Sequence, residues 1–162
     1  MHYTLRHLVD VPDAVDVLES AFVAEWEPWY GPDGGGDARA DLLACSSRTL
    51  LPLCLVAIDA AGVVAGTAAL KDESVGSEYG YGPWLAALLV RPEHRGRGVA
   101  RMLIAAIERE ARAVGTAALY CSTETLGCVL VQRDWAPVGS AQSLRGEIPI
   151  YRLVLDAERA GA

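Results

Sequence analysis

The stretch "LLVRPEHRGRGVARML", residues 88–103, joins an apolar segment to a charged turn with two glycines and then to a second apolar segment. The segment that leads into it, "PWLAALLV" (83–90), is apolar throughout, which predicts a central β-strand covered on both faces. The segment that follows, 98–115, repeats apolar residues at helical spacing and predicts a long amphipathic helix. The turn therefore connects a buried strand to the first turn of a helix.

This turn has the properties of a phosphate-binding junction. The first backbone N–H groups of a helix have no intrahelical partner and carry partial positive charge. Gly96 and Gly98 have no side chains, so an anion can approach these amides closely. Arg95, Arg97 and Arg101 add positive charge and forked hydrogen-bond donors. The turn is therefore expected to bind a phosphate-containing ligand.

Two common nucleotide motifs, GxxxxGK[ST] and GxGxxG with a ribose-binding acid, are absent. The residues "RGRGVA" (95–100) instead resemble the acetyl-CoA loop of the GNAT superfamily of N-acetyltransferases, [QR]-x-x-G-x-[GA]. The preceding "LLVRPEH" resembles that family's approach to the loop. The resemblance implies acetyl-CoA as cosubstrate, with the backbone of Leu88 and Val90 holding its pantetheine arm. It implies that the pyrophosphate is bound by Arg95, Gly96, Arg97, Gly98, Val99, Ala100 and Arg101.

The whole chain predicts a mixed α/β fold with the element order βααβββαβαββ. The expected elements are strand 3–9, helix 11–26, loop 27–37, helix 38–48, strands 53–59 and 63–72, strand 83–90, helix 98–115, strand 116–122, short helix 123–134, and strands 135–140 and 147–155. The GNAT resemblance implies a mostly antiparallel central sheet in which the fourth and fifth strands are parallel and splayed. We expect one domain over 1–155 and a flexible tail over 156–162.

The bulk properties are those of a soluble globular protein. Of the 162 residues, 52% are hydrophobic and 22% charged, and the net charge of −7 argues against nucleic acid or a membrane surface as partner. The four cysteines have no metal-ligand spacing, which predicts buried, reduced thiols and no metal. With no apolar signal or membrane segment, a cytoplasmic location is expected. GNAT proteins often pair through late strands, which makes 147–155 a candidate homodimer contact.

A second, narrower resemblance concerns the acceptor. The segments "GPWLAALLV", "ALYCST" and "RDWAPVG" resemble a GNAT branch with "PWLA" in the central strand and "GW" after the last helix. That branch includes the actin N-terminal acetyltransferases and bacterial proteins of unassigned substrate. The resemblance implies a peptide N-terminus or a small amine as acceptor, and an antibiotic amine is an alternative.

Family resemblance implies direct attack of a primary amine on the thioester, which needs a proton acceptor and a proton donor. Many relatives have a glutamate in the central strand, where this chain has Ala86 and Ala87. Many have a tyrosine on the short helix, where alignment on Trp135 gives Leu130, and Asp134 replaces the usual glycine. An impaired module that binds acyl-CoA as a sensor is therefore the main alternative to an enzyme.

Other groups are candidates for the proton transfers. Tyr120 and Ser122 lie two apart near the end of the fifth predicted strand and therefore share a face near the expected thioester. Both are also ordinary strand residues. The remaining candidates are the remote acids Glu25, Glu73 and Glu78, and Cys128 as a covalent nucleophile.

The loop "EWEPWYGPDGGGD" (25–37) is the candidate acceptor-binding segment, because GNAT acceptors usually enter past it. Trp29 and Tyr30, with Trp26, would wall a pocket for a cationic amine through their ring faces; Trp26 could instead complete the core stripe of its helix. Acids in and beside this loop and the negative net charge favour a cationic acceptor.

Overall fold

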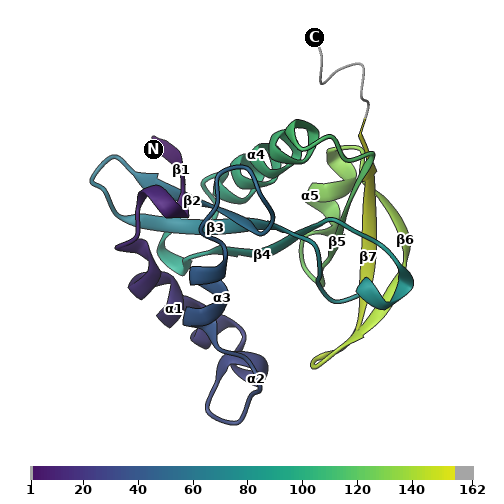
Figure 1. The fold of residues 1–162 in the computed structure, drawn as a ribbon, viewed down its shortest axis with the longest axis horizontal. Helices are drawn as coiled ribbons and strands as arrows, with labels where there is room; N and C mark the ends of the chain where they lie inside the picture. Colours follow the sequence, from purple (N-terminus) through teal and green to yellow (C-terminus); the bar gives the residue numbers. More distant parts are fainter. Residues whose placement is uncertain (1, 156–162) are drawn as a thin grey trace.

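Seven strands form one mixed sheet in a computed structural model that describes residues 2–155 (Figure 1). The strands are β1 (Tyr3–His7), β2 (Leu53–Asp59), β3 (Val64–Lys71), β4 (Trp84–Val90), β5 (Ala118–Ser122), β6 (Ala136–Ser143) and β7 (Gly146–Val154). Their order is β1-β2-β3-β4-β5-β7-β6, and only the β4–β5 pairing is parallel. This confirms the mixed α/β fold with parallel fourth and fifth strands. The predicted tail, 156–162, lies outside the described residues.

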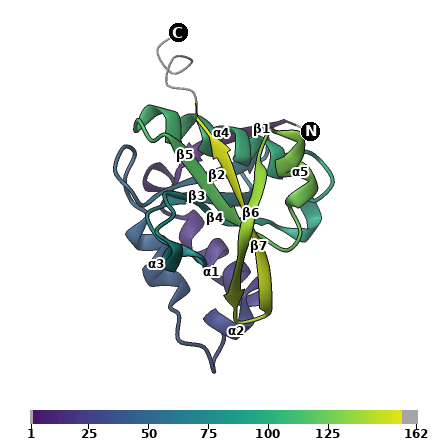
Figure 2. The ribbon, with the colours of Figure 1, turned by 90° about the vertical axis from the view of Figure 1, so that its right-hand side faces the viewer.

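Helices cover both faces of the sheet. They are α1 (Ala14–Glu25), α2 (Glu27–Tyr30), α3 (Ala38–Ala44), α4 (Val99–Ala113) and α5 (Gly127–Gln132). In Figures 1 and 2, α1 and α3 lie on one face and α4 and α5 on the other. Three short 3₁₀ turns occur at Leu8–Asp10, Ser77–Tyr79 and Pro92–His94.

Two predicted segments differ from the structure. The expected loop 27–37 contains α2, a single helical turn with Pro28 in its first turn, where a missing N–H costs no hydrogen bond. The helix expected over 38–48 ends at Ala44, because Ser46 and Ser47 form β-bridges to Leu53 instead. The first difference lies within the predicted acceptor-binding loop 25–37, and the second lies in the helix that follows it.

The core has a layer on each face of the sheet. On the α4 face, Leu103, Ile104 and Ile107 pack on the sheet, as the helical spacing of 98–115 predicts. On the other face, Leu18 and Phe22 of α1 pack with residues of α3 and β2. β3 is buried along 64–70, which identifies it as an interior strand.

A buried carboxylate that the sequence did not single out ties α4 to the end of α5. Glu108 is only 4% exposed and accepts hydrogen bonds from Arg133 Nε (3.0 Å) and Nη2 (2.6 Å) and from Trp135 Nε1 (2.9 Å). The same pairing raises the pKa of the Arg133 guanidinium. Removing Arg133 would leave the buried Glu108 carboxylate without its charged partner, which would strongly destabilise the fold.

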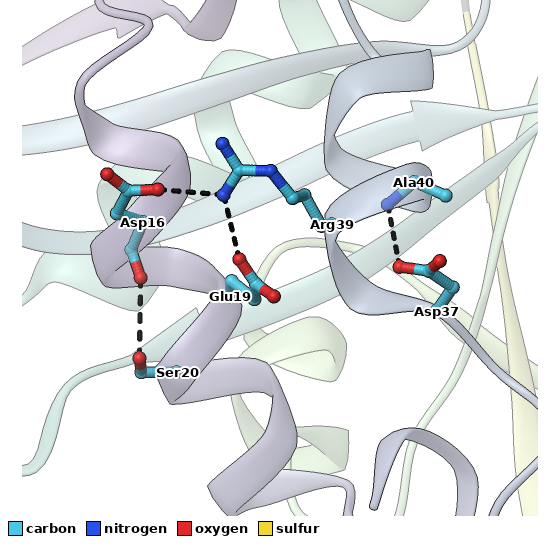
Figure 3. Close-up of polar contacts among 6 residues, drawn as sticks. All are labelled: Asp16, Glu19, Ser20, Asp37, Arg39 and Ala40. Atoms are coloured by element: carbon cyan, nitrogen blue, oxygen red, sulfur yellow. Dashed lines mark hydrogen bonds and ion pairs between the residues drawn. The ribbon is translucent and has the colours of Figure 1, made fainter.

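Surface contacts join α1 to α3, on either side of α2 (Figure 3). Arg39 Nη1 donates to Asp16 Oδ1 (2.7 Å) and Glu19 Oε2 (2.9 Å), and Asp37 caps α3 by accepting from the Ala40 amide (3.0 Å). Because these groups are exposed, each contact contributes little to stability. Together they fix the two ends of the segment that carries α2.

The homodimer expectation meets a topological limit. Residues 147–155 fall mostly in β7, which lies between β5 and β6 inside the sheet. The strand at this edge is β6, so sheet extension between two chains would proceed through β6 rather than β7.

Among the described residues, no helix is long and apolar enough to cross a membrane.

Candidate functional site

The parallel strands β4 and β5 diverge almost at once. Their register contains a single residue pair, Trp84↔Tyr120, at the first residue of β4. Past this pair, Ala86 to Leu88 and Val90 are partly exposed, although β4 is a central strand of the sheet. Strands that separate in this way leave an opening along β4, on the side where β5 would otherwise pair. The splay expected from the resemblance is therefore present.

A bulge in β4 lies at this opening. Ala69 pairs with Ala86 and Thr67 pairs with Leu89, so Ala87 and Leu88 together oppose one β3 residue. Ala87 has a φ of 52°, a left-handed conformation that is uncommon for a residue with a side chain. The bulge leaves backbone groups without β3 partners where β5 has already diverged. The sequence "AALL" gave no signal for it.

The turn before α4 has an open, uncapped helix N-terminus. Gly98 is the N-cap, with φ 81° and ψ 9°, and no side chain caps the helix. Gly96 also has a positive φ, 73°, and a Cβ on either glycine would meet no atom within 4 Å. The first turn contains no acidic residue. The glycines therefore supply left-handed backbone, and the amides remain open to an anion.

The predicted phosphate-binding residues Arg95 and Arg101 contact other parts of the protein. Arg95 Nε donates to the Val90 carbonyl (2.9 Å), and its Nη2 lies 3.4 Å from Glu25 Oε2 at the end of α1. Arg101 Nη2 donates to Gln132 Oε1 of α5 (2.5 Å). A phosphate would have to compete for these guanidinium groups, whereas the turn amides need no such exchange. Val90 O is also one of the backbone groups predicted to hold pantetheine.

The two predicted catalytic hydroxyls lie on one face of β5, as the alternation predicted. Leu119 and Cys121 are buried on the opposite face, and burial raises the pKa of the Cys121 thiol to about 12. The Tyr120 ring stacks on Tyr81, with centroids 4.6 Å apart and planes 9° apart, and packs near the Trp84 ring at 5.7 Å. Ser122 lies past the single β4–β5 pair.

The position on α5 where many relatives have a tyrosine is occupied in this chain by a buried core residue, Leu130. Leu130 has no exposed surface and packs in the α4-side cluster, so it supplies no proton donor. Asp134 has a φ of 71°, which explains why relatives have glycine there and why a short polar side chain is tolerated. The sequence analysis did not identify Tyr151 of β7 as a candidate proton donor. Its hydroxyl lies against Gly127 at the start of α5, so a Cβ at position 127 would collide with that hydroxyl.

The weaker catalytic candidates are dispersed. Cys128 is exposed on α5, whereas the other three cysteines are buried. His94 is hydrogen-bonded to Tyr3 (3.1 Å) and His7 lies 3.2 Å from Glu110, so neither histidine is paired with Cys128. The acids at 25, 73 and 78 are exposed, and Glu25 is next to Arg95.

The predicted substrate residues line a pocket, which we name the Trp29 pocket. It has a volume of about 640 Å³ and lies between α2, α3 and the end of β3. Its lining is Trp29, Tyr30, Asp41, Pro52, Lys71, Asp72, Glu73 and Ser74. Trp26 does not line it but packs on Phe22 (ring centroids 5.0 Å apart) in the α1 core. The structure thus groups Trp29 with Tyr30 and assigns Trp26 to the core.

Comparison with solved structures supports the fold. The protein yncA from Salmonella typhimurium, solved with its cofactor acetyl-CoA, has a TM-score of 0.69 at 20% identity, covering 96% of this chain and 95% of that one. An aminoglycoside 6'-N-acetyltransferase complexed with coenzyme A has a TM-score of 0.73 at 13% identity, covering 95% and 97%. An N-acetyltransferase from Staphylococcus aureus Mu50 has a TM-score of 0.70 at 18% identity, covering 96% and 100%. Similarity at this level of identity shows the fold alone.

Sequence comparison identifies the family. A search of curated proteins found no match. The sequence model of the acetyltransferase (GNAT) family matches residues 17–131, most of the chain and all of the segment from α2 through the turn before α4. With the splayed strands and the open helix N-terminus, this match shows that the chain belongs to the GNAT acetyltransferase family.

Proposed function

We propose that the protein is an acetyl-CoA-dependent N-acetyltransferase that acts on a primary amine. The observation that carries this proposal is the uncapped N-terminus of α4 beside the opening between β4 and β5. We name residues 95–101 the coenzyme turn and residues 27–41 the acceptor segment. The first would bind the coenzyme, and the second would select the amine.

The coenzyme turn fits a diphosphate through its backbone. Gly96 and Gly98 both have left-handed backbone and lead into the open amides at the N-terminus of α4, which suit an anion. Val99, Ala100 and Arg101 continue it into the first turn of α4. Arg95, Arg97 and Arg101 would add charge around the phosphates.

The pantetheine arm would run along β4. The exposed backbone of Leu88, Val90 and the bulge at Ala87 faces the opening that β5 leaves. Binding there would replace the Arg95 hydrogen bond to the Val90 carbonyl. This places the thioester near the bulge and past the Trp84↔Tyr120 pair.

In the reaction, the ammonium acceptor first loses a proton, and the neutral amine nitrogen attacks the thioester carbonyl carbon. The C–S bond then breaks, the nitrogen gives a second proton to water or a carboxylate, and the departing thiolate gains a proton from a protein hydroxyl that water reprotonates. Tyr120 and Ser122 are the side chains we assign to donate that proton, because both lie on the partly exposed face of β5, at or past its single residue pair with β4. The Tyr120 ring is fixed by its stack on Tyr81, which preorganises its hydroxyl. Exposed acids and water would accept the proton from the amine.

The acceptor would be a cationic amine, either a small molecule or a peptide N-terminus. Trp29 and Tyr30 line the pocket, and three of its other lining residues, Asp41, Asp72 and Glu73, are acids. The segments "PWLA" (83–86) and "RDWAPVG" (133–139) favour a peptide N-terminus, as in the branch they resemble.

A second candidate function is a coenzyme-binding sensor without turnover. It is favoured by Ala86 and Ala87, which leave no carboxylate at the expected place on β4, and by Leu130, which is core. It would use the coenzyme turn unchanged and would require no acceptor pocket.

Measuring thiol release from acetyl-CoA with a panel of alkylamines, diamines, aminoglycosides and short peptides tests these functions. Amine-dependent release together with a product heavier by one acetyl group supports the enzyme. Saturable acetyl-CoA binding without release for any amine supports the sensor. An aminoglycoside preferred over all other amines would favour a resistance enzyme.

A further inference from the structure

We propose that the Trp29 pocket binds a second positive charge of the acceptor, so that the preferred substrates are diamines or other amines with a distal cationic group. This inference rests on the proposed acetyl transfer and narrows its substrate class. It is carried by an open pocket that is lined by packed aromatic residues, contains three acids against one base, and lies away from the proposed reaction centre.

The aromatic walls of the pocket are held in place. Gly36 packs directly on the Trp29 indole, and Gly34 packs on the Trp29 carbonyl, so neither position has room for a Cβ. Tyr30 donates to Asp41 Oδ2 (2.6 Å), and its ring stacks on Phe22 with centroids 5.8 Å apart. Burial, with the Asp41 contact, raises the Tyr30 pKa far above its ordinary value, so the phenol remains a neutral donor. Trp29 nevertheless stays 46% exposed, with its ring available to a ligand.

The charge of the pocket favours a cation. Its lining contains three acids, Asp41, Asp72 and Glu73, against the one base Lys71. None of the ion pairs found within residues 2–155 involves Lys71, Asp72 or Glu73. A cation entering this space would meet uncompensated carboxylates and aromatic ring faces together, which is the environment that stabilises ammonium groups.

The pocket lies on the same face as the proposed reaction centre but away from it. Lys71 pairs with Trp84, and Ala69 pairs with Ala86 beside the bulge. Two residues of strand rise and one strand spacing separate Lys71 from Ala86, which is about 8–9 Å between backbones. Asp72 and Glu73 lie farther along the chain. An amine reacting at the bulge would therefore reach the pocket with a group several bonds away.

Three acceptors with the same reacting amine and the same chain test this arrangement: 1,8-diaminooctane, octylamine and 8-aminooctanoate. They differ only in the distal group, which is a cation, a methyl or a carboxylate. We expect kcat/KM for the diamine to exceed that for octylamine by about tenfold, the size of one desolvated cation–π contact with added charge. The acceptor with the carboxylate, 8-aminooctanoate, should have the lowest kcat/KM. A preference for it would mean that the pocket binds an anion through Lys71, and this would overturn the proposal.

The variant pair Asp72→Asn with Glu73→Gln should bring the diamine and octylamine rates close together. The matched control is Asp13→Asn with Glu124→Gln, which removes the same charge from exposed positions outside the pocket and outside the acceptor segment. The control should retain the diamine preference. Equal loss in both double variants would indicate general charge attraction and would overturn the specific site.

Calorimetry with 1,8-diaminooctane alone separates failure of the site from failure of the enzyme. Saturable heat that Asp72→Asn with Glu73→Gln abolishes supports the pocket even if no acetyl transfer occurs. Acetylation of octylamine and the diamine at equal rates, with no diamine heat, would leave the enzyme intact and refute the pocket.

Discussion

The coenzyme turn and the acceptor segment are the two proposed binding surfaces, and they use different parts of the chain. The turn uses backbone amides, positioned by two left-handed glycines and the start of α4. The acceptor segment uses side chains from α2 and α3, completed by residues at the end of β3. Backbone recognition leaves a short local motif, whereas side-chain recognition depends on segments brought together by folding.

The difference also separates what each region binds. An open helix N-terminus suits any phosphate diester or anhydride, so the turn would be shared among relatives with the same coenzyme. A pocket of three acids, one lysine and two aromatic rings suits only certain acceptors. On this proposal, the first region accounts for the coenzyme that relatives share and the second for the choice of acceptor.

The largest expected effect comes from placing charge in the coenzyme turn. Gly98→Glu should weaken acetyl-CoA binding by more than about 100-fold, because a carboxylate would oppose the diphosphate at the helix N-terminus. Gly98→Gln has the same size and the same left-handed strain and should retain much more affinity. Equilibrium dialysis with acetyl-CoA measures both, and equal losses in the two variants would mean that backbone strain, not charge, decides binding.

Removing the proposed proton donor should lower turnover next most strongly. Tyr120→Phe keeps the stack on Tyr81 and should reduce kcat by about tenfold or more with unchanged thermal stability. Tyr79→Phe, in the neighbouring exposed loop, is the control and should be neutral. A normal rate for Tyr120→Phe combined with a slow Tyr151→Phe would transfer the role to the hydroxyl beside Gly127.

Arg95 of the coenzyme turn contacts Glu25 at the end of α1, and its replacement should have a moderate effect. Arg95→Ala should weaken acetyl-CoA binding by about tenfold, the loss of one charge-assisted contact. The melting temperature should barely change, because the pair with Glu25 is exposed and long at 3.4 Å. A large drop in melting temperature with intact affinity would make Arg95 a structural residue instead.

The smallest effect should arise in the acceptor segment. Tyr30→Phe removes the hydrogen bond to Asp41 but keeps the ring stack on Phe22, so the acceptor KM should rise by about two- to fivefold. Acetyl-CoA affinity should not change, since the two regions act separately. Steady-state kinetics with each substrate varied in turn checks this, and a weaker acetyl-CoA affinity would contradict that separation.

The sequence was sufficient for the parts that depend on local pattern. The apolar run 83–90 predicted β4, and the glycine spacing at 96 and 98 predicted an open turn before α4, because both features are set by neighbouring residues. The sequence also predicted that Trp29 and Tyr30 lie together, because they are adjacent in one aromatic-containing loop.

The remaining features depend on tertiary contacts. The bulge at Ala87 arises from the β3–β4 register, which no alanine signals. Arg95 turns toward Glu25, 70 positions earlier in the chain, and the contribution of Asp72 and Glu73 to the acceptor pocket requires β3 to end beside α2. Leu130 could be placed on α5 from the sequence, but only packing shows that it is fully buried.

The central claim is that the coenzyme turn holds a diphosphate. Calorimetric titration of the unmodified protein tests this claim by comparing acetyl-CoA with S-acetylpantetheine, which lacks the nucleotide and its phosphates. The account predicts saturable heat and protection from melting with acetyl-CoA, and much weaker binding of S-acetylpantetheine. Equal affinity for the two ligands, or no heat with either, would contradict it.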